Sequence, residues 1–183
     1  RYPFGYGLTY TDFKTAYKAF VVDKTITVTA TVKNIGNFTS REVIQVYFSA
    51  PCGKLGKPAK QLIAYKKTKE LKPQETETLN ISFDINQMSS YDDSGITGNE
   101  FCYVLETGAY YIYAGNSVRN NECVLTYTVD ETVVTEKLEQ VLPPEKEFKR
   151  FTAKLDSNGN KMLTRTDAPL RKFDLDERIK ERR

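Results

Sequence analysis

The sequence predicts an all-β fold, an antiparallel sandwich of about seven strands followed by a C-terminal segment of irregular and helical character. Three observations support this prediction. Short segments alternate apolar and polar residues, turn-forming residues separate them at regular intervals, and no amphipathic helical pattern interrupts residues 11–131. The 12 Tyr and 10 Phe residues agree with it, because aromatic rings pack well on pleated sheets.

Residues 25–32 show the alternation most clearly, because their apolar side chains, from Ile26 to Val32, share one face and threonines share the other. Such a pattern predicts a strand that is buried on one side. Residues 42–48 are apolar on both faces and therefore predict a central strand. The remaining strands are predicted at residues 61–67, 78–85, 100–105, 108–115 and 122–129.

Turn signals lie between these strands at residues 34–37 and 71–75, and a long polar loop is predicted at residues 86–99. The last two strands are expected to pair as a hairpin. This rhythm is typical of immunoglobulin or fibronectin type III sandwiches. Tyr110 lies two residues after Gly108, where such sandwiches place a corner tyrosine whose hydroxyl bonds to nearby backbone.

The two ends of the sequence differ from this body. Residues 1–10 hold Tyr2, Phe4, Tyr6 and Tyr10, which would be a costly patch in water, so we expect a connector that packs against an upstream domain. Residues 132–183 lack a strand rhythm and end in a helix-like run at 174–183, which indicates a linker to a downstream domain.

The predicted division is therefore a connector at 1–10, a sandwich at 11–131 and a linker at 132–183. The sequence starts at Arg1 rather than Met and stops within a charged run, so we expect both neighbouring domains to lie outside it.

Composition argues against several classes of protein. Basic and acidic residues are equal in number over residues 1–131, so the net charge of +3 lies in the tail and no nucleic-acid-binding face is expected. The chain has no His, the commonest general base and metal ligand, and no metal-spaced Cys pair, so we expect neither a metal site nor a cofactor. No apolar segment approaches the roughly 20 residues of a membrane span.

The three cysteines, Cys52, Cys102 and Cys123, are an odd number. Buried free thiols are favoured over a single disulfide, because Cys often behaves as a small core residue. Unpaired thiols favour a cytoplasmic over a secreted protein.

Several short motifs in a fixed order carry a family resemblance. PFGYGLTY at residues 3–10 is followed by VKNIG at 32–36, EVIQVY at 42–47, LKP at 71–73, GAY at 108–110 and GNS at 115–117. Together they resemble the fibronectin type III-like domain found near the C-terminus of many family 3 glycoside hydrolases, over about residues 1–130.

The resemblance implies a parent enzyme of the β-glucosidase type, which hydrolyses terminal β-glycosidic bonds in oligosaccharides. In that family the nucleophilic Asp lies in a (β/α)8 barrel and the acid/base Glu in or near an α/β sandwich domain, and neither motif occurs here. This chain alone is therefore expected to be inactive and to pack against those two domains of the same polypeptide. Residues 132–183, and 162–167 in particular, resemble the link to the barrel in members of permuted domain order.

Other candidate sites have plainer explanations. Glycoside hydrolysis needs two carboxyls that flank a cleft, whereas adjacent loop carboxyls point apart and are usually solvated. The candidates by residue type are Asp92, Asp93, Asp174, Asp176 and Glu177.

Two further motifs are also expected to be structural or accidental. Residues 156–160 resemble the start of a calcium loop, but the twelfth position is Asp167 rather than Glu, so an Asn-Gly turn is favoured. The glycosylation sequons at Asn37 and Asn80 are expected to occur by chance.

Tyr110, Tyr111 and Tyr113 keep open an alternative class, an independent carbohydrate-binding or adhesion module, since aromatic rings stack on pyranose rings. Adjacent residues of a strand face opposite sides, so some of this set must belong to the core. The preferred hypothesis is a non-catalytic structural domain that packs against and positions catalytic domains, with at most weak carbohydrate contact.

Overall fold

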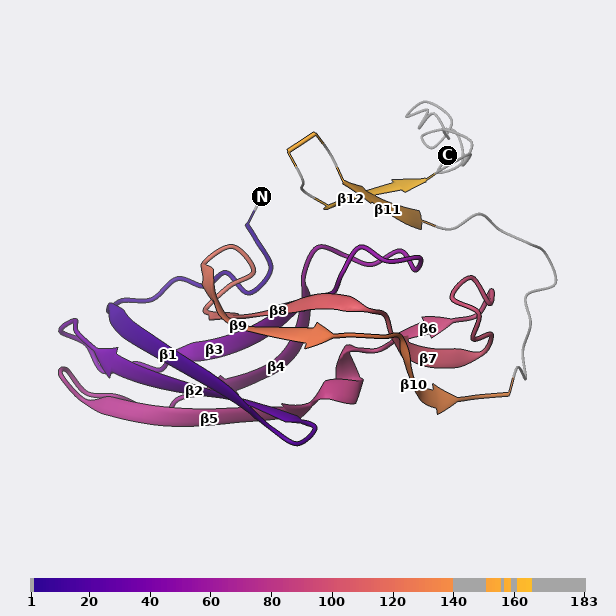
Figure 1. Cartoon of the computed structure of the whole chain (residues 1–183). Helices are drawn as coiled ribbons and strands as arrows, with labels where there is room; N and C mark the ends of the chain where they lie inside the picture. The colour runs from indigo at the N-terminus through magenta and orange to yellow at the C-terminus, as the bar shows by residue number, and fades with distance from the viewer. Residues whose placement is uncertain (1, 140–150, 156, 159–160, 166–183) are drawn as a thin grey trace, which may run out of the picture.

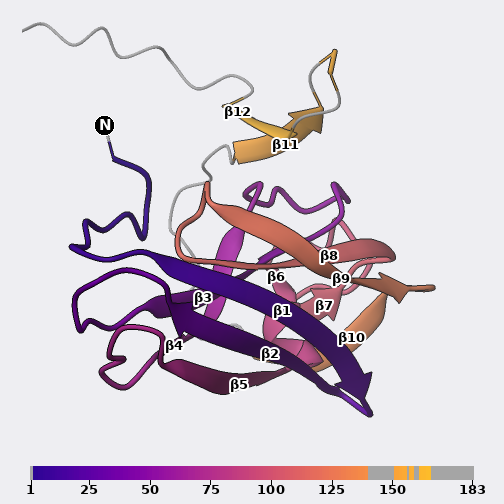
Figure 2. The ribbon, with the colours of Figure 1, turned by 90° about the vertical axis from the view of Figure 1, so that its left-hand side faces the viewer.

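The computed structural model describes residues 2–139, 151–155, 157–158 and 161–165. Two antiparallel sheets pack face to face in it, as the sequence predicts (Figures 1 and 2). One sheet has the order β1–β2–β5, with β1 at Phe13–Val22, β2 at Thr25–Asn34 and β5 at Thr76–Asp84. The other has the order β4–β3–β8–β9, with strands at Gln61–Lys67, Val43–Ser49, Gly108–Gly115 and Asn121–Val129.

A smaller sheet lies at one end of the sandwich, at the right of Figure 1. Its order is β10–β7–β6, with β6 at Ser90–Asp92, β7 at Cys102–Leu105 and β10 at Val133–Lys137. A short 3-10 helix at Ile85–Met88 joins β5 to this sheet. Strands β11 (Phe151–Leu155) and β12 (Lys161–Arg165) pair with each other as a hairpin. No helix among the described residues is long and apolar enough to cross a membrane.

The core lies between the two large sheets and comes from the alternating strands. Ile26, Val28, Ala30 and Val32 of β2 are fully buried, as the alternation predicts. Ile44 and Val46 of β3 and Ile112 of β8 face them from the other sheet and are also fully buried. Burial of each large aliphatic side chain contributes about 1.5–3 kcal/mol, so this layer is the main source of stability.

All seven predicted strands are present, and the predicted hairpin is formed by β8 and β9. Strand β1 was not predicted, because the apolar run Phe20–Val22 hides its alternation. Its inward residues, Phe13, Tyr17 and Ala19, pack on the core, and the strand pairs with β2 along its whole length. Strand β6 lies inside the predicted polar loop at residues 86–99.

The prediction that residues 132–183 are irregular or helical is wrong for the part that the structure describes. Strand β10 pairs with β7, with a bulge between Val134 and Glu136 that breaks its alternation. Strands β11 and β12 add a hairpin where no strand was expected. The sequences of β10 and β12 show no clear alternation of apolar and polar residues, because pairing with a neighbouring strand rather than local pattern makes them strands. The predicted helix at 174–183 lies outside the described residues.

The cysteine prediction is correct about pairing and only partly correct about burial. All three thiols are free, and Cys102 is buried on β7. Cys52 and Cys123 are exposed, because Cys52 lies in a surface loop and Cys123 on the outward side of β9.

One buried side chain fixes the end of the sandwich where the chain enters. The Asn34 amide donates to the carbonyl oxygens of Phe38, at 2.7 Å, and Leu71, at 2.8 Å. Its Oδ1 accepts from the Thr11 hydroxyl at 2.8 Å. The two predicted turns and the start of the sandwich body therefore converge on Asn34, which sets where the preceding segment leaves the fold.

Candidate domain-docking surface

The segment Tyr2–Tyr10, here called the connector, lies on the sandwich in a defined conformation. Its first turn closes with a hydrogen bond from the Tyr6 amide to the Pro3 carbonyl at 3.1 Å. Gly5 takes φ +77° at the third position of that turn, a conformation that favours glycine. The rings of Tyr2 and Tyr6 stack with their centroids 4.7 Å apart.

Gln45 of β3 holds the connector against the four-stranded sheet. Its Nε2 donates to the Gly5 carbonyl at 3.3 Å and to the Asn116 carbonyl at 2.7 Å. Its Oε1 accepts from the hydroxyl of Tyr47, two residues along the same face. A Cβ at Gly5 would clash with the Gln45 side chain, so this close approach also needs glycine. The amide of Val118 adds a hydrogen bond to the Phe4 carbonyl at 3.1 Å.

The connector is anchored through its backbone, and its side chains face outward. Tyr2 is 79% exposed, Phe4 65%, Tyr6 47% and Tyr10 93%. Leu8, which was not among the predicted packing residues, is 87% exposed. Contiguous exposed apolar groups of this kind are typical of interaction surfaces.

Tyr110 belongs to β8 of the four-stranded sheet, and its side chain is buried in the core on the opposite face from the connector. Its hydroxyl donates to the Glu106 carbonyl at 3.2 Å, four residues back along the chain. Burial raises the pKa of Tyr110, with the Glu106 carboxylate acting in the same direction, so the phenol stays protonated and keeps this bond.

Glu106 also pairs with a buried cation, a feature that the sequence analysis missed. Its Oε2 lies 2.6 Å from Lys57 Nζ, and both side chains are almost fully buried. The contact is an ion pair without good hydrogen-bond geometry. The carboxylate also accepts from the amides of Lys54, at 2.6 Å, and Leu55, at 3.3 Å. One side chain thus fixes the loop between β3 and β4 to the start of β8.

Asp92, one of the carboxyls considered for chemistry, is engaged by the loop that follows it. Asp92 is fully buried and accepts hydrogen bonds from Ser94, Ile96 and Thr97. Burial opposes its ionisation, but these hydrogen bonds outweigh burial and lower the pKa of Asp92. The carboxylate therefore serves to fix the loop before β7. Among the described residues, no group of three or more His, Cys, Asp or Glu side chains could hold a metal ion.

The other acidic candidates, Asp174, Asp176 and Glu177, lie outside the described residues, as do Asp156 and Asp167 of the calcium-like segment.

The tyrosines of β8 that were considered for sugar binding, Tyr110, Tyr111 and Tyr113, are divided between the two faces of the sheet, as expected from alternation. Tyr110 points into the core, whereas Tyr111 is 43% exposed. Lys60 Nζ lies 3.9 Å from the centroid of the Tyr113 ring and covers it.

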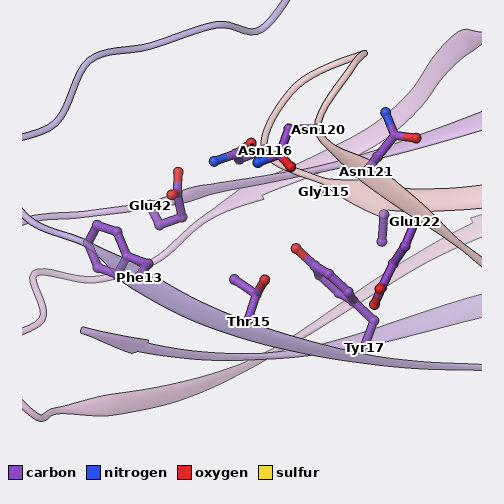
Figure 3. A pocket seen from close by; sticks show the side chains of 10 residues that line it. Phe13, Thr15, Tyr17, Glu42, Gly115, Asn116, Asn120, Asn121 and Glu122 are labelled. Atoms are coloured by element: carbon purple, nitrogen blue, oxygen red, sulfur yellow. Dashed lines mark hydrogen bonds between the residues drawn. The ribbon is translucent and has the colours of Figure 1, made fainter. Parts of the chain in front are cut away.

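A polar cavity of about 310 Å³ opens beside the connector (Figure 3). Strand β1 supplies Phe13, Thr15 and Tyr17, and Glu122 comes from the start of β9. Glu42 and the Asn-rich loop at residues 116–120 complete it. A second cavity, of about 390 Å³, lies under residues 5–9 and shares Glu42, Asn116 and Asn120 with the first.

Gln45, Glu106 and Lys57 are the structural residues that sequence reasoning missed. The sequence could have pointed to Gln45, since it is the one polar residue of the otherwise apolar run 43–48. Glu106 and Lys57 gave no such signal, because their pairing joins positions 49 residues apart.

Comparison with known proteins finds relatives of this arrangement. Residues 42–118 match the family described as fibronectin type III-like domain. A β-glucosidase of Ruminococcus albus is 45% identical over 174 residues, which are 95% of this chain and 18% of that protein.

Two solved structures are also similar. A β-glucosidase from Paenibacillus barengoltzii has a TM-score of 0.83 and 40% identity over 99% of this chain and 21% of its own. The GH3 β-glucosidase of Bifidobacterium adolescentis has a TM-score of 0.64 and 26% identity over 78% of this chain and 20% of its own. This chain spans about a fifth of the length of these relatives.

Proposed function

Because the chain belongs to the fibronectin type III-like domains of family 3 β-glucosidases, we propose that it is a non-catalytic structural domain of a larger enzyme of that type. The parent enzyme would hydrolyse terminal β-glycosidic bonds in oligosaccharides, with its catalytic carboxyls outside this chain. The domain's role is to pack against the catalytic barrel and the α/β sandwich domain of the same polypeptide and to fix their placement.

The connector carries this proposal. Its backbone is fixed by Gln45 and Val118, while its aromatic side chains stay exposed. A flexible tether needs no such anchoring, and contiguous exposed aromatic side chains are typical of a surface that a neighbouring domain covers. Residues 1–10 are thus proposed to be the packing surface for the preceding domain.

The region after the sandwich has a related role in this proposal. Similarity to the Ruminococcus albus and Paenibacillus barengoltzii enzymes extends over 95% and 99% of this chain, and so includes most of residues 132–183. These relatives therefore share the region after the sandwich, and we propose that it links to a barrel that follows, as in a permuted domain order. Tyr110 is proposed as the corner tyrosine that locks the start of β8.

The proposal can be tested in a full-length β-glucosidase that contains this chain. Replacing Tyr6, Leu8 and Tyr10 together by Ser should lower the melting temperature of the parent and its residual activity after heating. The same triple variant of the 183-residue chain should lose little stability, because Leu8 and Tyr10 are largely exposed there and Tyr6 loses only its stacking on Tyr2, worth about 0.5–1.5 kcal/mol.

Phe20→Ser is the matched control. Phe20 is 49% exposed on β1, away from the connector, so its loss should change neither protein by more than about 0.5 kcal/mol. A parent enzyme that tolerates the triple variant with unchanged stability and activity would disprove the docking role.

A carbohydrate-binding module is the second candidate function. The polar cavity beside the connector is the specific observation in its favour. It leads to a separate inference, which does not depend on the docking role.

A further inference from the structure

We infer that the cavity between β1, the start of β9 and the loop at residues 116–120 binds a neutral saccharide of one or two hexose units. Its volume of about 310 Å³ lies at the lower end of the roughly 300–1,000 Å³ typical of small-molecule sites. The tyrosines of β8 that the sequence suggested as a sugar platform do not line this cavity. Its wall instead contains Thr15 and Tyr17 of β1, which the sequence did not suggest.

The cavity offers unused hydrogen-bonding groups of both kinds. Among the described residues, no hydrogen bond or ion pair engages the Glu122 carboxylate. The Asn120 amide donates to Asn116 Oδ1 at 2.8 Å, which leaves the Asn116 amide free to donate and Asn120 Oδ1 free to accept. Glu42 uses Oε1 to accept from the Val43 amide, which leaves Oε2. Sugar hydroxyls need such a mixture, because each one both donates and accepts.

Tyr17 adds an aromatic ring and a hydroxyl to the same wall. Burial raises the pKa of Tyr17, and the carboxylates of Glu122 and Glu42 act in the same direction, against a hydrogen bond with Thr15. The hydroxyl therefore stays protonated. The Tyr17 ring supplies apolar surface for the C–H face of a pyranose, beside acceptors for its hydroxyls, and Phe13, four residues earlier on β1, lines a separate part of the wall (Figure 3).

The loop that carries the asparagines is held rigidly before any ligand arrives. Asn121 donates to the carbonyls of Ser117, at 2.9 Å, and Val118, at 2.7 Å, and accepts from Lys60 at 2.6 Å. A Cβ at Gly115 would clash with the Asn120 carbonyl, so glycine is required where the loop folds back. Such preorganisation reduces the entropy lost on binding.

Other ligand classes fit this lining less well. An anion would meet Glu42 and Glu122 with no Lys or Arg in the cavity wall. A calcium ion needs six to eight oxygen ligands, and the described residues contain no cluster of three acidic side chains that could supply most of them. An apolar ligand would leave the amides and carboxylates buried without partners. A neutral polyhydroxylated ligand satisfies all of these groups.

The test is a titration of the ¹⁵N-labelled 183-residue chain with glucose and with cellobiose, followed by NMR. The side-chain amides of Asn116 and Asn120 report directly on the cavity. We expect their signals to shift in a saturable way at millimolar sugar. Glu122→Gln should weaken binding about tenfold, because one carboxylate oxygen becomes an amide donor and the remaining acceptor loses its charge.

Glu131→Gln is the matched control, since Glu131 is an exposed carboxylate outside the cavity, and it should leave the affinity unchanged. Absence of a saturable shift with either sugar would overturn the inference, as would equal affinity in Glu122→Gln. Shifts of the same amides by calcium chloride alone, with none by sugar, would overturn it in favour of a cation site.

Discussion

The two outer faces of the sandwich are built differently. On the three-stranded sheet, the outward residues of β2 and β5 are hydroxyls and amides that bond across the strands, such as Thr27 with Ser82 and Thr29 with Asn80, each at 2.9 Å. These pairs are exposed to solvent. On the four-stranded sheet, the outward residues Gln45, Tyr47 and Ser49 of β3 are 7%, 1% and 9% exposed.

An outward strand residue becomes buried only when something lies over it. The connector covers this face at Gln45, and Lys60 covers the Tyr113 ring, whose residue pairs with Tyr47 in the sheet. An antiparallel sheet ordinarily leaves one face in water, as the three-stranded sheet does. The four-stranded sheet is therefore the side that carries attached segments, and the proposed docking surface, the connector, lies on it.

The largest effect should come from breaking the ion pair that fixes the loop on the covered side. Glu106→Gln leaves the Lys57 cation, only 2% exposed, without a counter-charge, which should cost about 3–5 kcal/mol of unfolding free energy. Urea denaturation measures this loss. The exposed pair of Arg41 and Glu70 provides the control, since Glu70→Gln should cost less than about 1 kcal/mol. Equal losses from the two variants would contradict the account.

A smaller loss should follow from removing the anchor of the connector. Gln45→Ala leaves the Asn116 carbonyl and the Tyr47 hydroxyl without their partner, at a cost of about 1–3 kcal/mol. Hydrogen exchange of the Tyr6 amide should accelerate in the same variant, because the turn it closes is no longer held. If that amide exchanges at the wild-type rate, Gln45 does not hold the connector.

Tyr47→Phe should cost about 1 kcal/mol and should also change the response to alkaline pH. Burial raises the pKa of Tyr47 above its usual 10.0. Its stabilising contribution is therefore complete below pH 10 and is lost as the pH rises through the higher folded-state pKa. Unfolding free energy measured from pH 9 upward should fall more steeply for the wild type than for the variant. Parallel curves would show that Tyr47 is accessible to water.

The smallest effect should come from the solvated face. Thr29→Val removes an exposed hydrogen bond to Asn80 and keeps a β-branched side chain, so the change should stay within about 0.5 kcal/mol. Thermal unfolding measures it. A loss comparable to that of Gln45→Ala would mean that the two faces do not differ as described.

The sequence predicted the fold well where the pattern is local. Strict alternation located β2 and β5, and turn residues separated the strands correctly. It failed at β10, where a bulge and pairing with β7 create a strand that has no alternation of its own. Local pattern also does not predict which outward residues of the four-stranded sheet are covered, because the burial of Tyr47 depends on segments far away in the chain.

The proposed docking surface was only partly predictable for the same reason. The aromatic connector is visible in the sequence, and its exposure in the fold agrees with a surface that awaits a neighbour. Its anchor, Gln45, and the cavity beside it form only when β1, β3 and the loop at residues 116–120 come together. Long-range hydrogen bonds of this kind leave no periodic trace in a sequence.

Hydroxyl-radical footprinting tests the central claim most directly, because it reports the solvent exposure of individual aromatic side chains. The 183-residue chain is compared with a full-length β-glucosidase that contains it. The account predicts that oxidation of Tyr2, Phe4, Tyr6 and Tyr10 falls severalfold in the full-length enzyme, while oxidation of Phe20 on the solvated face stays the same. Connector residues that oxidise equally fast in both proteins would contradict it.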